Sequence, residues 1–412
     1  MSSRLLSKLS GSAADQAMMS LVSFASSMAL IRLASKSDYG LFVLFFSVIY
    51  LVQGIQNALV LSPYITRVSS TGSESKEVAL YLVTRGLFVI SIVSSAFIII
   101  SFDRYLTSNN IATTPYILLF FSLALFGWLA RESTRAIQYT EGNIRSAVIN
   151  SIVYASIVVC YLAYSIFISN ISLGILFLAI GVAGISVLLI RPRVVSNKLG
   201  WRNELVEFLA LGKWAIIGAV GAWVTGNYYP FFVNDSFDIK TVADIGASKL
   251  LVMPFALLIP AWSSIFRPMI GRWYVDGNFS QISKSVNYST ALIGGCLLIY
   301  SLLVFFFYKD ISFVFGDKYS DLAYFVVAWC VYYLFFAYRT FCQSVLLCTR
   351  VGYKSLSLIS LLSFFIFWPS LFFGAKFGPV GVIGSLIFVE CFQSIAVWNQ
   401  VRLTINMQTG YS

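Results

Sequence analysis

The amino-acid sequence predicts an all-α integral membrane protein that crosses the bilayer twelve times. Hydrophobic residues make up 58% of its 412 residues, and charged residues make up only 11%. A soluble domain carries about 25% charged residues, and the mean hydropathy here is +0.83. Because a soluble fold of this size could not bury so much apolar surface, we expect most of the chain to lie in lipid.

Twelve apolar runs support this prediction. A membrane-spanning helix needs about 20 apolar residues, whereas a transmembrane β-strand has only about 10 residues and alternates in polarity. The runs are longer than such a strand and apolar on all sides, which favours helices. We expect spans at residues 11–33, 39–62, 78–101, 114–138, 145–168, 171–190, 212–233, 241–266, 286–307, 321–347, 355–375 and 378–400.

The first two spans are joined by IRLASKSDYG, residues 31–40, which places three charges between two apolar runs. Gly40 and the polar residues are expected to release the backbone from helical geometry and form a tight outer hairpin. Asp38 lies near the start of the second helix, where the helix dipole favours a negative charge.

The longest polar segment, residues 191–213, separates six predicted helices from six others. It predicts a cytoplasmic linker in which ELVEFLALGKW could form an amphipathic helix on the membrane surface. The expected N-terminal lobe is therefore residues 1–190, and the expected C-terminal lobe is residues 214–412. Since six is even, both lobes enter the membrane from the same side.

Short motifs recur in the two halves about 205 residues apart. SDYG (Ser37–Gly40) and PYITR (Pro63–Arg67) flank the second span, and ADIG (Ala243–Gly246) and PMIGR (Pro268–Arg272) flank the eighth. The order and near-constant offset indicate two six-helix lobes related by a parallel pseudo-two-fold repeat, with an axis along the membrane normal.

The distribution of charge predicts the orientation. With both termini in the cytoplasm, the inner loops and ends carry eighteen Lys and Arg residues, and the outer loops carry six. This asymmetry follows the positive-inside rule, so the net charge of +11 needs no nucleic-acid partner. The sequence has no histidine, and its six cysteines lack the spacing of zinc ligands, so we expect no metal site.

Four segments, IRLASKSDYGLFVLFFS, ADIGASKLL, FGDKYSDL and KFGPVGVIGS, resemble the bacterial polysaccharide transporters. These are the Wzx-type O-antigen flippases of the multidrug/oligosaccharidyl-lipid/polysaccharide exporter superfamily. The resemblance implies a flippase that moves undecaprenyl-pyrophosphate-linked oligosaccharide repeat units of O-antigen, capsule or exopolysaccharide. The cargo would pass from the inner to the outer leaflet of the bacterial inner membrane by alternating access. Candidate partners are the lipid bilayer, a polysaccharide polymerase and chain-length proteins.

The resemblance implies a transporter without cofactors rather than an enzyme, coupled to protons or sodium ions. No nucleotide-binding loop of the form G-x-x-x-x-G-K-[ST] is present, so direct use of ATP is not expected. Many relatives carry an acidic residue in the seventh helix, where this chain reads TGNYYPFF without a carboxylate. An ion-coupling role cannot be carried over to that position.

A pyrophosphate diester carries two negative charges, and Arg and Lys are the side chains that bind phosphate. Charged residues inside a membrane usually face protein or water. Five residues are therefore candidates for pyrophosphate binding: Arg339, Arg85, Lys249, Arg32 and Arg131. Arg339 leads because it is the hardest to extend to the headgroups. The alternatives are a buried ion pair for Arg339 and headgroup contacts for Arg85 and Lys249. For Arg32 the alternative is an ion pair with Asp38 or a headgroup contact. Arg131 forms a charged patch with Glu132 and Arg135, and for this patch the alternative is the ordinary basic end of a long helix.

Two carboxylates are candidates for ion coupling: Glu390, near the middle of the twelfth helix, and Asp15, near the inner end of the first. Each could instead be structural, Glu390 as the partner of Arg339 or another cation and Asp15 as a helix-start residue. Tyr228 and Tyr229 are candidates for stacking on sugars, because Pro230 breaks the seventh helix beside them. Packing is the alternative for both tyrosines.

Other functions remain open. A flippase for another lipid-linked glycan or a multidrug/cation antiporter would belong to the same superfamily, but a cationic drug calls for an acidic cavity and the interior charges here are mainly basic. A membrane polysaccharide polymerase would need a sizeable loop or domain for its catalytic site. The longest outer segments have only about a dozen residues.

Overall fold

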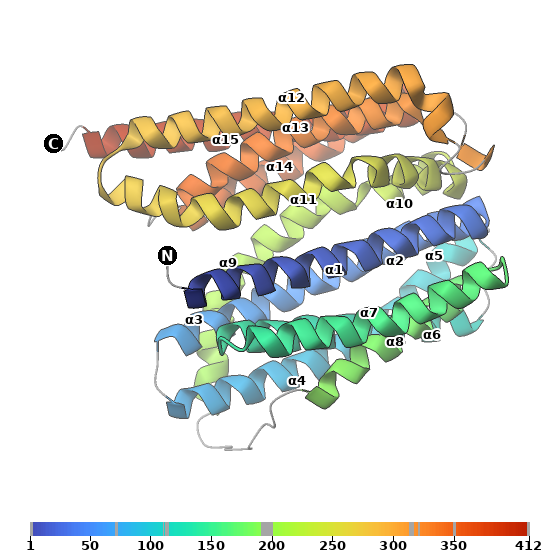
Figure 1. Ribbon diagram of the computed structural model, residues 1–412, viewed down its shortest axis with the longest axis horizontal. Helices are drawn as coiled ribbons and strands as arrows, with labels where there is room; N and C mark the ends of the chain where they lie inside the picture. The colour runs from blue at the N-terminus through green and yellow to red at the C-terminus, as the bar shows by residue number, and fades with distance from the viewer. Residues whose placement is uncertain are drawn as a thin grey trace. The chain divides into compact units, whose positions relative to one another are not determined.

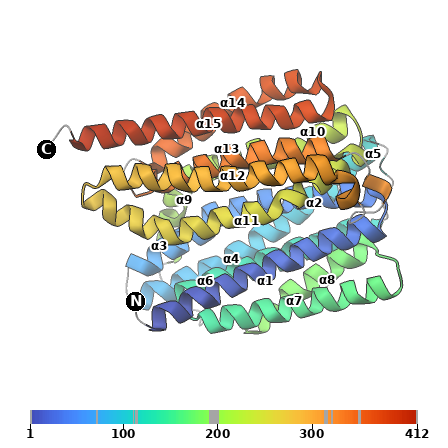
Figure 2. The same ribbon diagram turned by 45° about the horizontal axis from the view of Figure 1, so that its top comes forward.

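The computed structural model of the protein describes residues 3–70, 73–109, 111, 115–190, 201–312, 317–319, 322–348 and 352–409. All regular secondary structure in these ranges is helical (Figures 1 and 2), which confirms the predicted all-α class. Many large apolar side chains on the helices are exposed. Helices that are apolar on all sides are typical of chains that face lipid, where every backbone polar group must be satisfied internally.

Eleven helices in the described part of the chain are long and apolar enough to cross a membrane, so the protein is a multi-pass membrane protein. The remaining predicted span, residues 212–233, is divided. A shorter apolar stretch, Ala215–Asn227, is followed by the separate helix α10 (Tyr229–Ser236). Pro230 lies in the first turn of α10, where its missing amide hydrogen costs nothing, so the helix breaks where the sequence predicted.

The chain forms two compact units, Met1–Val220 and Gly221–Ser412. The first half of the predicted linker, residues 191–200, lies outside the described residues. Its second half is the start of α9 (Trp201–Asn227), so the predicted surface helix continues directly into the apolar stretch. The boundary between the units therefore falls inside a helix.

The N-terminal unit contains eight further helices. Two π-helical segments, η1 (Asn57–Leu61) and η2 (Ile98–Phe102), join α2 to α3 and α4 to α5, so that each pair makes one long span. A 3₁₀ turn, η3 (Val187–Ile190), follows the last helix. The helices are α1 (Ser3–Leu33), α2 (Lys36–Gln56), α3 (Ser62–Ser70), α4 (Ser73–Phe97), α5 (Asp103–Ser108), α6 (Pro115–Thr140), α7 (Ile144–Phe167) and α8 (Leu173–Ser186).

Glycine allows α6 and α8 to touch backbone to backbone. A Cβ atom at Gly184 on α8 would lie 2.2 Å from the carbonyl oxygen of Gly127 on α6. A Cβ at Gly127 would lie 2.5 Å from the carbonyl oxygen of Gly181. Small residues at helix contacts are how membrane helices approach closely enough to pack. The helix α6, which carries several candidate residues, is fixed in this way.

The C-terminal unit is built around α13, which packs against α11, α12 and α15, while α14 packs against α15 (Figure 1). A short 3₁₀ turn, η4 (Asp317–Tyr319), precedes α13. The helices of this unit after α10 are α11 (Ile239–Val275), α12 (Phe279–Ser312), α13 (Ala323–Leu346), α14 (Gly352–Ala375) and α15 (Gly378–Thr409).

The turn between α1 and α2 is shorter than predicted. Ser35 caps α2: its hydroxyl accepts the Asp38 amide at 3.1 Å, and the Asp38 carboxylate accepts the Ser35 amide at 3.3 Å. The position predicted for Asp38 at the helix start is confirmed. The role predicted for Gly40 is wrong, because Gly40 is buried inside α2 and the capping box already ends the turn.

Candidate functional site

Six of the nine candidate side chains lie in two clusters, one in each unit. The N-terminal cluster lies where α1, α6 and α7 meet. The C-terminal cluster is formed by α10, α11, α13 and α15. The N-terminal cluster consists of Asp15, Arg131, Glu132, Arg135, Tyr139 and Ser151. The C-terminal cluster consists of Tyr229, Lys249, Trp329, Tyr332, Arg339 and Glu390.

Asp15, a predicted coupling carboxylate, is completely buried on α1. Arg135 Nε donates a hydrogen bond to its Oδ2 at 2.8 Å, and the Tyr139 hydroxyl donates to the same oxygen at 2.6 Å. Ser151 on α7 donates to the other oxygen, Oδ1. Arg135 and Tyr139 are four residues apart and share a face of α6. The carboxylate is therefore neutralised and satisfied, and it ties three helices together.

Arg131, a predicted pyrophosphate ligand, is buried on α6 beside this pair. Its guanidinium carbon lies 4.6 Å from the centre of the Trp128 ring and 4.8 Å from that of Tyr154. The guanidinium also forms an ion pair with Glu132 and donates to Met19 Sδ at 3.5 Å. The N-terminal cluster thus holds two cations and two carboxylates and has no excess charge.

Arg339 on α13 and Glu390 on α15 form one ion pair, which is the structural alternative that the sequence left open for both residues. Arg339 Nε donates to Glu390 Oε2 at 2.7 Å, and Nη2 donates to Oε1 at 3.2 Å. This two-point geometry is the strong form of an arginine–carboxylate contact. The Tyr332 hydroxyl donates to Glu390 Oε1 at 3.2 Å, and Gln343 accepts from Arg339 Nη1 at 3.3 Å. The positive charge of Arg339 is therefore balanced by the Glu390 carboxylate.

Lys249 on α11 is different. Its ammonium lies 4.9 Å from the centre of the Trp329 ring and 5.1 Å from that of Tyr229. Aromatic faces attract a cation but do not neutralise it. No carboxylate of the described residues lies within ion-pair distance of Lys249. It is half-buried, so its three N–H donors sit in the span with two aromatic rings as neighbours.

The two candidate tyrosines have different surroundings. Tyr229 is 3% exposed and packs on Trp329 with 5.6 Å between ring centres, so it forms the floor under Lys249. Tyr228, between α9 and α10, is half-buried and packs on Trp223, Phe231 and Trp368. Tyr228 therefore has a partly open ring, whereas Tyr229 is covered.

The two remaining candidates lie outside both clusters. Arg85 on α4 is exposed, and its guanidinium carbon is 4.9 Å from the centre of the Tyr81 ring. Arg32 is exposed in the last turn of α1. Both side chains are exposed at the surface of the N-terminal unit.

Glu132 and Arg135 belong to the charged patch that the sequence showed beside Arg131, and Arg135 shares a helix face with Arg131. Four members of the clusters were not singled out: Tyr139, Ser151, Trp329 and Tyr332. Trp329 and Tyr332 belong to an aromatic-rich stretch with no local mark of their importance. Among the described residues, no group of three or more His, Cys, Asp and Glu side chains could hold a metal ion.

The fold matches solved membrane transporters along nearly the whole chain. An inward-facing multidrug resistance MATE family transporter of the MOP superfamily is 12% identical, with a TM-score of 0.78 over 95% of this chain and 96% of that chain. The lipid II flippase MurJ, inward closed, is 13% identical, with a TM-score of 0.69 over 95% and 87%. An outward-facing MATE transporter is 13% identical, with a TM-score of 0.61 over 99% and 96%.

No protein-family model and no curated protein sequence matches this chain. At such low identity the structural likeness shows the fold alone. The chain therefore has the two-lobed helical fold found in MATE transporters and in the lipid II flippase MurJ.

Proposed function

We propose that the protein is a flippase for a glycan linked to a polyprenyl pyrophosphate. In this proposal it moves undecaprenyl-pyrophosphate-linked oligosaccharides from the inner to the outer leaflet of the bacterial inner membrane. The observation that supports it most directly is Lys249, a cation inside a span with aromatic neighbours and no carboxylate at ion-pair distance among the described residues. A charged side chain inside a membrane span is energetically costly, so its presence there indicates a functional site.

The rings beneath Lys249 suit a site that must bind and then release an anion. Tyr229 and Trp329 hold the ammonium in place while the cargo is absent. A phosphate oxygen then accepts a charge-assisted hydrogen bond from the ammonium, which is stronger than the ring contacts. Lysine acts as a point charge on a flexible stem, so it can follow a moving phosphate better than a rigid arginine fork.

The same cluster offers a route to ion coupling. Arg339 is occupied by Glu390 through two hydrogen bonds. A proton on Glu390 would remove the negative charge and leave the guanidinium free for the second charge of the pyrophosphate. Uptake of a proton and binding of the anion would then favour each other, which is the reciprocal linkage that coupled transport requires. A proton binds a single carboxylate oxygen of Glu390, whereas a sodium ion needs several oxygen ligands. We therefore propose protons as the coupling ion.

A second candidate, export of cationic drugs, is favoured by the likeness to MATE transporters. It needs a carboxylate that is free to meet a cation. The predicted coupling carboxylates, Asp15 and Glu390, are each paired with an arginine. The excess charge that remains in the C-terminal cluster is positive, which favours an anionic cargo. We therefore place the flippase first.

The proposal is tested by transport in vesicles. The purified chain is reconstituted, a fluorescent undecaprenyl-pyrophosphate oligosaccharide is added, and its appearance in the opposite leaflet is followed with a membrane-impermeant quencher. Wild type should move the cargo. Lys249→Gln should lower the rate about tenfold or more, since a hydrogen bond to a charged group contributes about 1.5–3 kcal/mol.

Lys284→Gln is the matched control. Lys284 is exposed on α12, a helix that contributes no residue to the C-terminal cluster, and its replacement makes the same change in net charge. It should transport like wild type. Efflux of a cationic dye by wild type, together with no movement of the lipid-linked sugar, would reject the flippase and favour the drug antiporter.

A further inference from the structure

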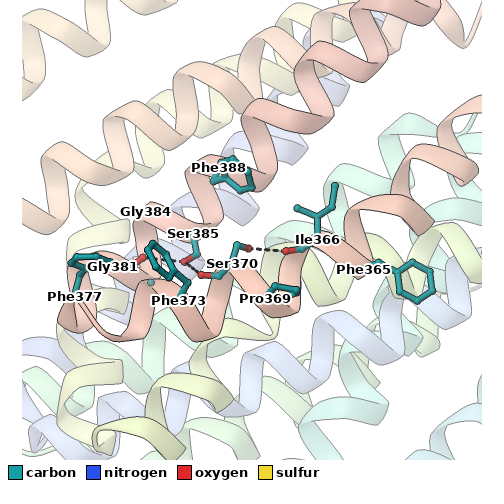
Figure 3. A pocket seen from close by; sticks show the side chains of 11 residues that line it. Phe365, Ile366, Pro369, Ser370, Phe373, Phe377, Gly381, Gly384, Ser385 and Phe388 are labelled. Atoms are coloured by element: carbon teal, nitrogen blue, oxygen red, sulfur yellow. Dashed lines mark hydrogen bonds between the residues drawn. The ribbon is translucent and has the colours of Figure 1, made fainter.

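An apolar groove runs between α14 and α15 in the C-terminal unit (Figure 3). It encloses about 750 Å³, which is within the range of about 300–1,000 Å³ typical of ligand pockets. Its walls include four phenylalanines that are each more than half exposed. These are Phe365 and Phe373 on α14, Phe377 in the turn, and Phe388 on α15.

The groove exists because the two helices touch at one point and separate beyond it. A Cβ at Gly374 would lie 2.3 Å from the carbonyl oxygen of Gly381, so the backbones meet there. Three residues further along α15, a Cβ at Gly384 would meet no atom within 4 Å. Pro369 lies inside α14 beside this space, where its ring removes a backbone hydrogen bond of the helix.

The chemistry of the lining selects an apolar ligand. No charged residue lines the groove. Its two hydroxyls are both used within the protein: Ser385 donates to the Ser370 carbonyl at 2.6 Å, and Ser370 donates to the Phe367 carbonyl at 2.8 Å. Figure 3 shows these serines at the floor with the phenyl rings around them. A ligand finds rings and glycines there, and no free donor.

The groove is connected by packing to the Lys249 site. Trp368, next to Pro369 on α14, packs against Tyr228 with 5.1 Å between ring centres. Tyr228 adjoins Tyr229, whose ring lies 5.1 Å from the Lys249 ammonium. A second contact, between Phe372 and Phe232, joins the same helices at 5.4 Å. Aromatic contacts therefore lead from α14, which lines the groove, through α10 to the Lys249 site.

We infer that the groove binds the isoprenoid chain of the same lipid whose phosphate binds Lys249. This inference rests on the proposed function, because it takes the cargo to be a polyprenyl lipid. The methyl branches and double bonds of an isoprenoid chain pack against phenyl rings, and inside a bilayer such van der Waals contacts are the favourable contribution. Holding the tail beside the cluster raises the effective concentration of the phosphate at Lys249.

The test is photolabelling of the full chain in vesicles. The probe is undecaprenyl phosphate with a diazirine on its isoprenoid chain, and labelled residues are located by mass spectrometry. We expect labels on α14 and α15 at the groove. Excess undecaprenyl phosphate should remove them, and the same excess of phosphatidylglycerol should not. Equal competition by both lipids would show a site for general membrane lipid and overturn the inference.

Gly384→Leu should occupy part of the groove, because a Cβ at Gly384 meets no atom within 4 Å. It should lower labelling about tenfold, as expected for the loss of about ten atom contacts of about 0.1–0.2 kcal/mol each. Gly295→Leu is its matched control: Gly295 is exposed on α12, and a Cβ there also meets no atom within 4 Å. It should label like wild type. Unchanged labelling of Gly384→Leu would reject the groove as the tail site.

The two proposals fail in different ways. If wild type transports the lipid-linked sugar and Gly384→Leu labels normally, the groove inference is wrong and the function stands. Wild type could instead be labelled at the groove, with the label removed by excess undecaprenyl phosphate, and yet move no lipid-linked sugar. In that case the groove binds polyprenyl chains and the proposed function is wrong. Lys249→Gln should lose transport and keep the label, because it changes only the headgroup contact.

Discussion

Glu390 is 6% exposed, yet its two oxygens accept three hydrogen bonds, two from Arg339 and one from Tyr332. Breaking such a buried pair by removing one partner costs about 3–5 kcal/mol. Asp15 has the same kind of environment with Arg135, Tyr139 and Ser151. Both carboxylates therefore stabilise the folded units. Glu390 belongs to the same cluster as Lys249, for which no ion-pair partner is found among the described residues.

Glu390→Gln tests whether this pair couples transport to protons. Glutamine has the shape of a protonated glutamate, so Arg339 should be released permanently. We expect transport of the lipid-linked sugar that no longer increases with a proton gradient, whereas wild type is accelerated by it. The measurement is the vesicle assay with and without an imposed pH difference.

Asp15→Asn serves as the comparison, because Asp15 makes an equivalent pair in the other unit. It should retain the response to the gradient. Loss of the response in Asp15→Asn, with a normal response in Glu390→Gln, would move the coupling site to the N-terminal cluster.

At the residue scale, the sequence located the charged residues within the spans but left their partners open, and it named Arg339 only as one possible partner of Glu390. Arg339 and Glu390 are 51 residues apart in the chain, and Asp15 and Arg135 are 120 apart. Charges inside apolar runs are visible in the sequence, but pairing depends on which helices pack. Lys249 and Tyr229 were proposed for different tasks, the phosphate and the sugar, and the structure places one over the other.

At the scale of elements, the contact between α6 and α8 depends on glycine. Gly127→Ala would place a Cβ 2.5 Å from a backbone oxygen, so the helices must separate. Overpacking of this kind costs about 1–3 kcal/mol. We expect a lower unfolding midpoint of the purified protein in detergent, measured by tryptophan fluorescence during a denaturant titration.

Gly295→Ala is the control for the effect of alanine in a helix. A Cβ at Gly295 meets no atom within 4 Å, and alanine has the higher helix propensity, so stability should stay equal or rise. A Gly127→Ala midpoint equal to that of wild type would mean that the helices have room to separate without loss.

The N-terminus of α11 gives a pH-dependent element. Asp238 caps it by accepting the Thr241 amide at 2.6 Å. Burial alone would raise the pKa of Asp238, but the hydrogen bonds from Thr241 and the charge of Lys240 outweigh it and hold the pKa below the ordinary 3.8. The cap therefore contributes fully above pH 3.8, and its contribution is lost as the pH falls through the lower folded value.

Hydrogen exchange can follow this cap. The Thr241 amide should exchange at an unchanged rate, relative to its intrinsic rate, from pH 7 down to the ordinary pKa of 3.8, and faster below it. Loss of a cap costs about 1 kcal/mol, so the acceleration should be about fivefold. Asp238→Asn still caps and does not titrate, so its relative rate should be flat. A wild-type rate that is also flat at acid pH would contradict the prediction.

The ends of elements were harder to predict than their existence. The apolar run of the eighth span ends at residue 266, but α11 continues to Val275. The added residues include Arg272 and Trp273, residue types that are common in the headgroup region. Because this part of the helix is less apolar, hydropathy alone did not predict it. The π-helical segment η1 was not predicted either. It follows Gln56, which donates to the Leu129 carbonyl at 3.1 Å, a contact between distant parts of the chain.

At the scale of the whole molecule, the sequence repeat gives two units in which some charged residues occupy equivalent positions and others do not. Arg135 and Arg339 are 204 residues apart, close to the 205 between Pro63 and Pro268, and each lies on the fourth span of its unit. Both pair with a carboxylate, but on different helices. With the offset of 206 between Asp38 and Asp244, Val43 is the residue of the first repeat that is equivalent to Lys249. The N-terminal unit therefore has no cation at this position of the repeat.

The orientation of the chain follows from the even number of spans and the charge bias. Both termini should be cytoplasmic, because that arrangement puts eighteen Lys and Arg residues inside and six outside. The turn after α6 at Gly142 should then face the cytoplasm, and the turn after α7 at Asn170 should face outward. Alkaline phosphatase is active only outside the cytoplasm, so a fusion after Asn170 should be active and one after Gly142 inactive in a bacterial host.

A fluorescent protein that folds only in the cytoplasm should give the opposite pattern, and it should also be bright at the C-terminus. The orientation bears on function because a cargo assembled in the cytoplasm must meet Lys249 from the inner side first. Active phosphatase at Gly142 together with a dark C-terminal fusion would mean that the chain is inverted. The positive charges would then lie outside, and the direction of transport proposed here would have to be reversed.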